Sequence, residues 1–141
     1  MNRRRFLAGL ALAPFTTPPT PNRKACNMPT RLPYSDSRSI TLDGTGTGSV
    51  TFNGPPSLTV RELSTIVVNC ATATPRPTVK VYRSVIASNR LMVSSPVGND
   101  DTLVADPGDV LQSGEPLIIV WTGGAAGATC FANVNGTDIR A

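Results

Sequence analysis

Two cysteines lie in the segments with the strongest apolar character, and they are the first candidates for chemistry. Cys70 and Cys130 each fall within a run of residues that is typical of a buried strand. If the two runs face each other, the cysteines predict a disulfide between the two sheets of a sandwich. The alternative is that both are small apolar core residues. A disulfide between them would leave Cys26 unpaired.

Acidic and hydroxyl side chains are present, but their spacing matches no catalytic motif. The sequence contains no histidine, which removes the commonest general base and the commonest metal ligand. Asp100, Asp101, Asp106 and Asp109 carry oxygen atoms that suit calcium, although aspartate at these positions is also typical of turns. We therefore expect no enzymatic activity, no cofactor, no metal site and no small-molecule substrate.

Two glycine-containing motifs favour turns over ligand binding. Gly44-Thr-Gly-Thr-Gly48 lacks the lysine and the following helix of a phosphate loop, so it predicts a hairpin turn. Asn135-Gly-Thr137 has the form of a glycosylation acceptor. Because Asn-Gly is also a frequent hairpin turn, we predict a turn there as well.

The positive charge of the chain is concentrated at its start. Residues 1–25 carry five basic side chains and no acidic one. The other 116 residues carry eight basic and nine acidic side chains, which gives them a net charge of −1. Because phosphate binding needs clustered lysine and arginine, we expect no nucleic-acid-binding face on the domain.

Residues 1–33 are expected to form a separate segment in front of the domain. Arg3-Arg-Arg-Phe-Leu7 and the short apolar stretch that follows resemble a twin-arginine export signal, and the stretch is too short to span a bilayer. The alternative is an arm that docks on a neighbouring subunit through Phe6, Leu7, Leu10 and Phe15. The proline-rich stretch Thr16–Pro33 predicts an extended linker. The domain is then expected to span residues 34–141.

The domain sequence predicts an all-β, antiparallel, immunoglobulin-like β-sandwich. The 12 glycines and 13 prolines predict many turns, and they separate short apolar runs at the spacing of strands. The run Leu117–Trp121 predicts a central strand buried on both faces or nearly so, and Ala128–Val134 predicts its hairpin partner. Alternation within Leu58–Thr72 and Thr78–Tyr82 predicts two further strands, the first with a bulge or a bend at Glu62–Ser64.

A set of packing and turn residues extends over much of the domain. It consists of Val79-x-Val-Tyr-Arg83, Gly98-Asn-x-Asp-Thr102, a Leu111-x-x-Gly-Glu115 corner, Val120-Trp-Thr-Gly-Gly124, Gly127-Ala128 and, at the end of the last strand, Val134-x-Gly-Thr137. This set, over about residues 47–138, resembles small β-sandwich proteins encoded by tailed phages of actinobacteria. The resemblance implies a virion component, such as a minor capsid, head-decoration or tail-associated protein.

Two functions follow as expectations from these observations. The first is a non-enzymatic structural and interaction protein of a phage virion, which binds other virion proteins or further copies of itself and is anchored through its N-terminal arm. The alternative is a binding module that is exported by the twin-arginine route, is secreted or held at the bacterial cell envelope, and contacts glycan or protein through its loops. Export predicts that residues 1–25 are lost, whereas assembly predicts that they are retained.

Overall fold

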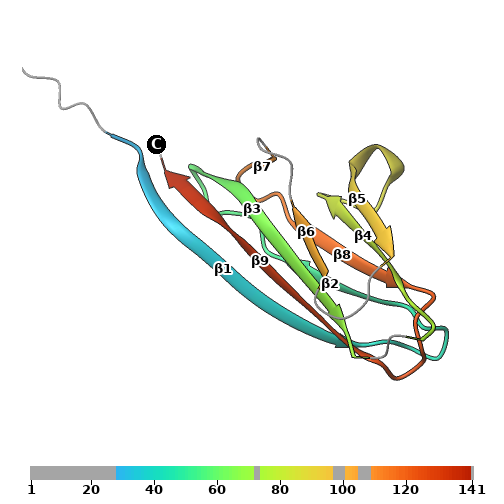
Figure 1. The fold of residues 1–141 in the computed structure, drawn as a ribbon. Coiled ribbons are helices and arrows are strands. Elements are labelled where there is room, and N and C mark those ends of the chain that lie inside the picture. Colours follow the sequence, from blue (N-terminus) through green and yellow to red (C-terminus); the bar gives the residue numbers. More distant parts are fainter. Residues whose placement is uncertain (1–27, 72–73, 97–100, 105–108, 141) are drawn as a thin grey trace, which may run out of the picture.

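A computed structural model describes residues 28–71, 74–96, 101–104 and 109–140, which fold into strands and one short 3-10 turn (Figure 1). The 3-10 turn η1 (Ser88–Arg90) directly precedes the fifth strand. The strands are β1 (Thr30–Thr41), β2 (Gly48–Phe52), β3 (Thr59–Cys70), β4 (Thr78–Arg83), β5 (Leu91–Pro96), β6 (Asp101–Val104), β7 (Val110–Leu111), β8 (Leu117–Thr122) and β9 (Thr129–Arg140).

Two antiparallel sheets pack face to face, so the predicted all-β antiparallel sandwich is confirmed (Figure 1). Sheet A has the order β1-β9-β3, with β6 and β7 both pairing with the far side of β3. Sheet B has the order β2-β8-β4-β5. The first and last strands of the described chain therefore lie next to each other in sheet A.

The connections between strands give the order of a jelly roll. The pair β1–β2 runs alongside β8–β9, and the pair β3–β4 runs alongside β5–β6. If β6 and β7 are counted as one interrupted strand, the two sheets have the order of an eight-stranded jelly roll. This connectivity differs from the immunoglobulin-like order suggested by the turn spacing, in which several consecutive strands pair within one sheet. Among the described strands only β4 and β5 are consecutive and paired.

The predicted hairpin between Leu117–Trp121 and Ala128–Val134 is wrong, because β8 lies in sheet B and β9 in sheet A. Residues 123–128 instead cross from one sheet to the other. The glycine turn at residues 44–48 also joins the two sheets rather than closing a hairpin. The crossings contact each other, since the Gly124 amide donates to the Gly46 carbonyl at 3.0 Å. A Cβ on Gly46 would overlap the Gly124 carbonyl, so this approach needs glycine.

The strand β9 continues through Asn135-Gly136, so the turn predicted there is wrong as well. Gly136 pairs with Tyr34 on one side and Leu63 on the other. A Cβ on Gly136 would overlap the Glu62 carbonyl. The register shifts between Leu63 and Thr65, which confirms the predicted bulge. The glycine therefore allows two backbones to approach at a bulge instead of reversing the chain.

The strand β1 begins at Thr30, so the sandwich starts before the expected boundary at Tyr34. Residues 30–33 already pair with β9, and Pro33 lies opposite Thr137. Proline is tolerated here because β1 is an edge strand, where a missing amide hydrogen need not break a ladder. The proline-rich composition suggested a linker, but its last residues belong to the sheet.

The core lies between the two inner sheet faces and is mainly aliphatic. On β8, Leu117, Ile119 and Trp121 are fully buried, while the residues between them are only partly buried. The strand is therefore fully buried on one face and not on both, as expected for a sandwich with a solvated outer surface. The other large core side chains are Leu42, Val50, Phe52, Leu63, Ile66, Val68, Val79, Val81, Leu111 and Val134.

One ion pair joins a buried arginine to a partly buried aspartate. Arg61 is 4% exposed and donates to both carboxylate oxygens of Asp138, with Nε–Oδ1 and Nη2–Oδ2 distances of 2.6 and 3.0 Å. Its Nη1 donates to the Asn53 carbonyl at 3.1 Å. The guanidinium carbon lies 3.2 Å from the centre of the Tyr34 ring. The arginine thus joins β1, β3, β9 and the segment after β2.

We expect Asp138→Ala to lower the free energy of unfolding by about 3–5 kcal/mol, because it leaves a buried guanidinium without its carboxylate. Urea denaturation followed by circular dichroism measures this change. The matched control is Glu62→Ala, which removes an exposed ion pair with Arg31 on the same sheet and should cost about 1 kcal/mol or less. Equal losses in the two variants would contradict a special role for the buried pair.

Candidate functional site

One end of the sandwich carries most of the large apolar side chains that the described residues expose. This loop end comprises residues 28–32, 53–58, 84–91 and 112–116 (Figure 1). Seven large apolar side chains are exposed among the described residues, and Phe131 is the one that lies elsewhere. The six at the loop end are Met28, Leu32, Leu58, Val85, Ile86 and Leu91. Such a concentration of apolar side chains is typical of an interaction surface.

The same end contains both non-glycine residues of the described chain that have positive φ angles. Leu58 has a φ of 60° and Ser84 a φ of 67°. A left-handed conformation costs free energy for a residue with a side chain, and a large apolar residue gains nothing local in return. Leu58 is nevertheless 74% exposed. Strain combined with exposure indicates that the position serves something other than stability of the isolated domain.

A single carboxylate fixes two of the loops at this end. Glu115 accepts hydrogen bonds from the Ser84 hydroxyl at 2.6 Å and from the Gln112 amide at 3.0 Å. It also lies 3.5 Å from Nε of Arg83. Burial would raise the pKa of Glu115, but these hydrogen bonds and the charges of Arg83 and Arg90 outweigh it and lower the pKa. The ionised carboxylate therefore holds the base of the loop that presents Val85 and Ile86.

The third loop is attached to the same segment through the backbone. The Gly114 amide donates to the Pro55 carbonyl at 2.8 Å, and the Ser113 hydroxyl donates to the Pro56 carbonyl at 3.0 Å. Residues 112–116 are thus bonded to both flanking loops. The apolar side chains of Leu58, Val85 and Ile86 are consequently held on a connected scaffold, and a partner would not have to order three independent loops.

The two cysteines predicted to pair are brought together, but within one sheet. Cys70 and Cys130 lie directly opposite each other on β3 and β9, both fully buried, with their Sγ atoms 2.8 Å apart. The expected link between the two sheets is therefore wrong, because both strands belong to sheet A. Both are free thiols. Burial, followed by the contact with Cys70, raises the pKa of Cys130 to about 12.

The remaining sequence candidates contribute little to a site within the described part of the chain. Phe6, Leu7, Leu10 and Phe15 lie outside the described residues, as do Asp100 and Asp106. Where side chains are described, no three histidine, cysteine, aspartate or glutamate residues gather as metal ligands would. The described residues include no helix able to cross a membrane. Sequence reasoning missed the loop end, although Leu58 after Pro55-Pro56 and the Val85-Ile86 pair were readable as apolar residues in turns.

Acid should weaken the domain partly through Glu115. Because its pKa is lowered in the folded state, this group stabilises the protein above the ordinary glutamate value of 4.5, and the contribution is lost as the pH falls through the folded-state pKa. We expect Glu115→Gln to cost about 1–3 kcal/mol at pH 7 and to lose this part of the pH dependence. The free energy of unfolding, measured by urea denaturation at several pH values between 3 and 7, reports both effects.

The matched control for this prediction is Ser84→Ala, which removes one of the hydrogen bonds to the carboxylate. It should retain part of the stabilisation, because the Gln112 amide and Arg83 remain. A difference between Glu115→Gln and the parent protein that persists unchanged at low pH would show that packing, and not charge, is responsible.

The two buried thiols should be inert in the folded protein, since the thiolate is the reactive form and both side chains are inaccessible. In a Cys26→Ser background, we expect iodoacetamide to leave Cys70 and Cys130 unmodified under native conditions and to modify both after unfolding in urea. Intact-mass spectrometry without reductant measures both outcomes. A mass lower by two hydrogen atoms, with no reaction after unfolding, would instead demonstrate a disulfide.

The comparisons with known proteins add no family to this description. No protein-family model, no curated protein and no solved structure matches the chain.

Proposed function

We propose that this protein is a non-enzymatic structural and interaction protein of a phage virion, attached to other virion proteins through its N-terminal segment and the loop end. Minor capsid, head-decoration and tail-associated proteins all fall within this proposal. The observation that carries it is the concentration of six of the seven exposed large apolar side chains at the end where β1 begins. The protein would then reside in the virion.

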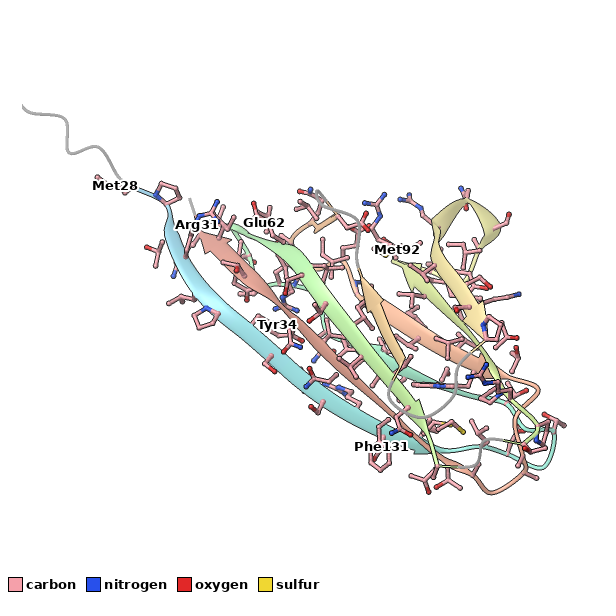
Figure 2. All side chains as sticks on the ribbon, viewed as in Figure 1. Met28, Arg31, Tyr34, Glu62, Met92 and Phe131 are labelled. Atoms are coloured by element: carbon pink, nitrogen blue, oxygen red, sulfur yellow. The ribbon has the colours of Figure 1, made fainter. Side chains whose placement is uncertain are left out.

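The arrangement of β1 supports attachment at this end. The strand starts at Thr30, next to the end of β9 at Arg140, so the chain enters β1 at the loop end. Figure 2 shows Met28 at this end of the sheet, and its side chain is 86% exposed. A partner that binds the N-terminal segment would therefore lie close to the strained loop with Leu58.

Burial of the loop end would supply the driving force for attachment. Each square ångström of apolar surface removed from water contributes roughly 25 cal/mol. Because the three loops are already bonded to one another, little of this contribution is offset by ordering them. Repeated attachment of copies to a particle would further increase the apparent affinity.

The order of the strands is a second, weaker support. Jelly rolls occur in viral capsid proteins, but also in lectins and cupins. A fold does not specify a function, so this support is an analogy at the level of architecture. It is consistent with the phage resemblance of residues 47–138 and independent of it.

A bacterial cell-envelope binding module exported by the twin-arginine route is the second candidate. One observation favours it, namely that the outer face of sheet A is polar and carries an exposed Phe131, as a ligand-binding surface does. In this case the protein would be secreted or held at the envelope, and it would have no virion partner.

The fate of the N-terminal residues in native material distinguishes the two candidates. We expect the protein to sediment with phage particles in a density gradient. Its intact mass should correspond to a chain that begins at Met1 or Asn2. A start beyond Phe15 in secreted or envelope material would overturn the virion proposal in favour of the exported module.

Removing apolar side chains from the loop end should weaken binding to particles that lack the protein. We expect the double variant Val85→Ser/Ile86→Ser to reduce the affinity by about tenfold or more, measured by cosedimentation. Leu58→Asn should do the same and leave the domain equally or more stable, because asparagine tolerates positive φ better than leucine does.

Phe131→Ser is the matched control, since it removes a comparably exposed apolar side chain at the opposite end of sheet A (Figure 2). It should bind particles as the parent protein does. If Phe131→Ser weakens binding and the loop-end variants do not, the attachment surface has been placed at the wrong end.

A further inference from the structure

The outer face of sheet A carries a block of uncharged polar side chains with one aromatic ring in it. Along β1, β9 and β3, residues opposite one another form rows across the sheet. Three successive rows are Ser35–Asn135–Thr65, Ser37–Asn133–Val67 and Ser39–Phe131–Asn69. Figure 2 shows Phe131 projecting from the sheet at the end opposite to Met28.

Four polar side chains in the first two rows, Ser37, Thr65, Asn133 and Asn135, are linked by hydrogen bonds. The Asn135 amide donates to the Thr65 hydroxyl at 3.2 Å and to the Asn133 side-chain carbonyl at 2.6 Å. The Asn133 amide in turn donates to the Ser37 hydroxyl oxygen. Since that oxygen accepts a bond, the hydroxyl hydrogen of Ser37 remains as a donor to a ligand. The surface is thus preorganised.

A shallow groove of about 410 Å³ lies over the second and third of these rows. Its volume falls within the range of about 300–1,000 Å³ that is usual for small-ligand sites. The groove residues on the outer face are Ser37, Ser39, Val67, Asn69, Phe131 and Asn133. The ring of Phe131 is 50% exposed, so one of its surfaces is available to a ligand.

Among the described residues, the groove has no unpaired cation that would select an anionic ligand. Arg38, the one charged residue along it, donates from Nε and Nη2 to Asp36 at 3.3 and 3.2 Å. Its guanidinium also lies 5.6 Å from the centre of the Phe52 ring. Because phosphate and nucleic acid require unpaired cationic groups, neither suits this surface.

A protein partner also suits the groove less well than a polyhydroxylated ligand does. The cores of protein interfaces are enriched in aromatic residues, methionine and arginine and depleted in serine. Here one phenylalanine and Val67 lie among serine and asparagine side chains, and the described residues that line the groove include no methionine or second aromatic ring. A sugar presents a face of C–H groups that can lie on an aromatic ring, and hydroxyls that both donate and accept. Those hydroxyls complement Ser37, Ser39 and the amides beside them.

We propose that the outer face of sheet A binds a neutral saccharide, with Phe131 as the surface on which the sugar ring lies and Ser37, Ser39 and Asn133 as hydrogen-bonding partners. This inference goes beyond the attachment function, since it concerns the other end of the sheet. Both surfaces can be engaged at once. A particle-bound copy would then present its saccharide site away from the particle.

Binding of the full chain to an array of immobilised neutral oligosaccharides tests the proposal. The array includes sugars of gluco, manno, galacto and arabino configuration. Heparin and polygalacturonate serve as anionic controls. We expect retention on at least one neutral saccharide and none on the anionic controls. Titration calorimetry with the best soluble oligosaccharide should then show Phe131→Ala weakening binding by about tenfold or more and Asn133→Ala by roughly fivefold.

Two variants make the result specific. Phe131→Trp keeps an aromatic surface and should keep binding, whereas Val85→Ser/Ile86→Ser changes only the loop end and should leave saccharide binding unchanged. The proposal is overturned if no neutral saccharide is retained, or if Phe131→Ala binds as tightly as the parent. A concentration-dependent dimer that Phe131→Ala abolishes, without saccharide binding, would assign the face to a second copy instead.

Discussion

The close passage of two inter-sheet crossings is the constraint on which the arrangement of the strands depends. The segment after β1 and the segment after β8 leave sheet A and sheet B at the same end, bonded through Gly46 and Gly124. This one contact relates both strand pairs, because β1 then lies beside β9 and β2 beside β8. With a side chain at Gly46, the two crossings could not approach this closely.

Arg61 applies a second constraint, at the other end of the core. Burying a charge is expensive, and an apolar residue of similar size would often be tolerated as well. The arginine specifies how the strands are placed relative to one another, because its donors fit the two oxygens of Asp138 and the Asn53 carbonyl in one arrangement. A slip of β9 by one residue would move the Asp138 carboxylate to the outer face and leave the guanidinium unpaired.

Local patterns in the sequence were sufficient to predict the class of fold, and long-range relations were not. Alternation over Thr78–Tyr82 and the bulge near Leu63 are local properties, and both predictions are confirmed. The choice of sheet for each strand is not local, because Leu117–Trp121 and Ala128–Val134 have the same apolar character whether they pair with each other or cross between sheets. Asn135-Gly136 failed as a turn because a strand bulge also uses glycine.

The candidate surfaces likewise combine local properties, which the sequence predicts, with long-range ones, which it does not. Cys70 and Cys130 were recognised as core residues from their neighbours, but their adjacency within one sheet depends on the pairing of β3 with β9. The loop end is assembled from three segments that are far apart in the chain and are joined around Glu115 and Gly114. No local pattern predicts that Leu58 and Ile86 share one end of the molecule. The uncharged rows of sheet A likewise exist only once Ser37, Asn133 and Val67 are in register.

The length of the β1–β9 ladder has a mechanical consequence. The two strands are in register over twelve residue pairs, from Thr30–Arg140 to Thr41–Thr129. If the chain is held before Thr30 and pulled through a ligand near Phe131, the force runs along β1, parallel to the strands. The ladder is then loaded in shear, so its hydrogen bonds share the tension instead of opening one after another. Force applied between Thr30 and Arg140 would instead peel the same strands apart from one end, with far less resistance.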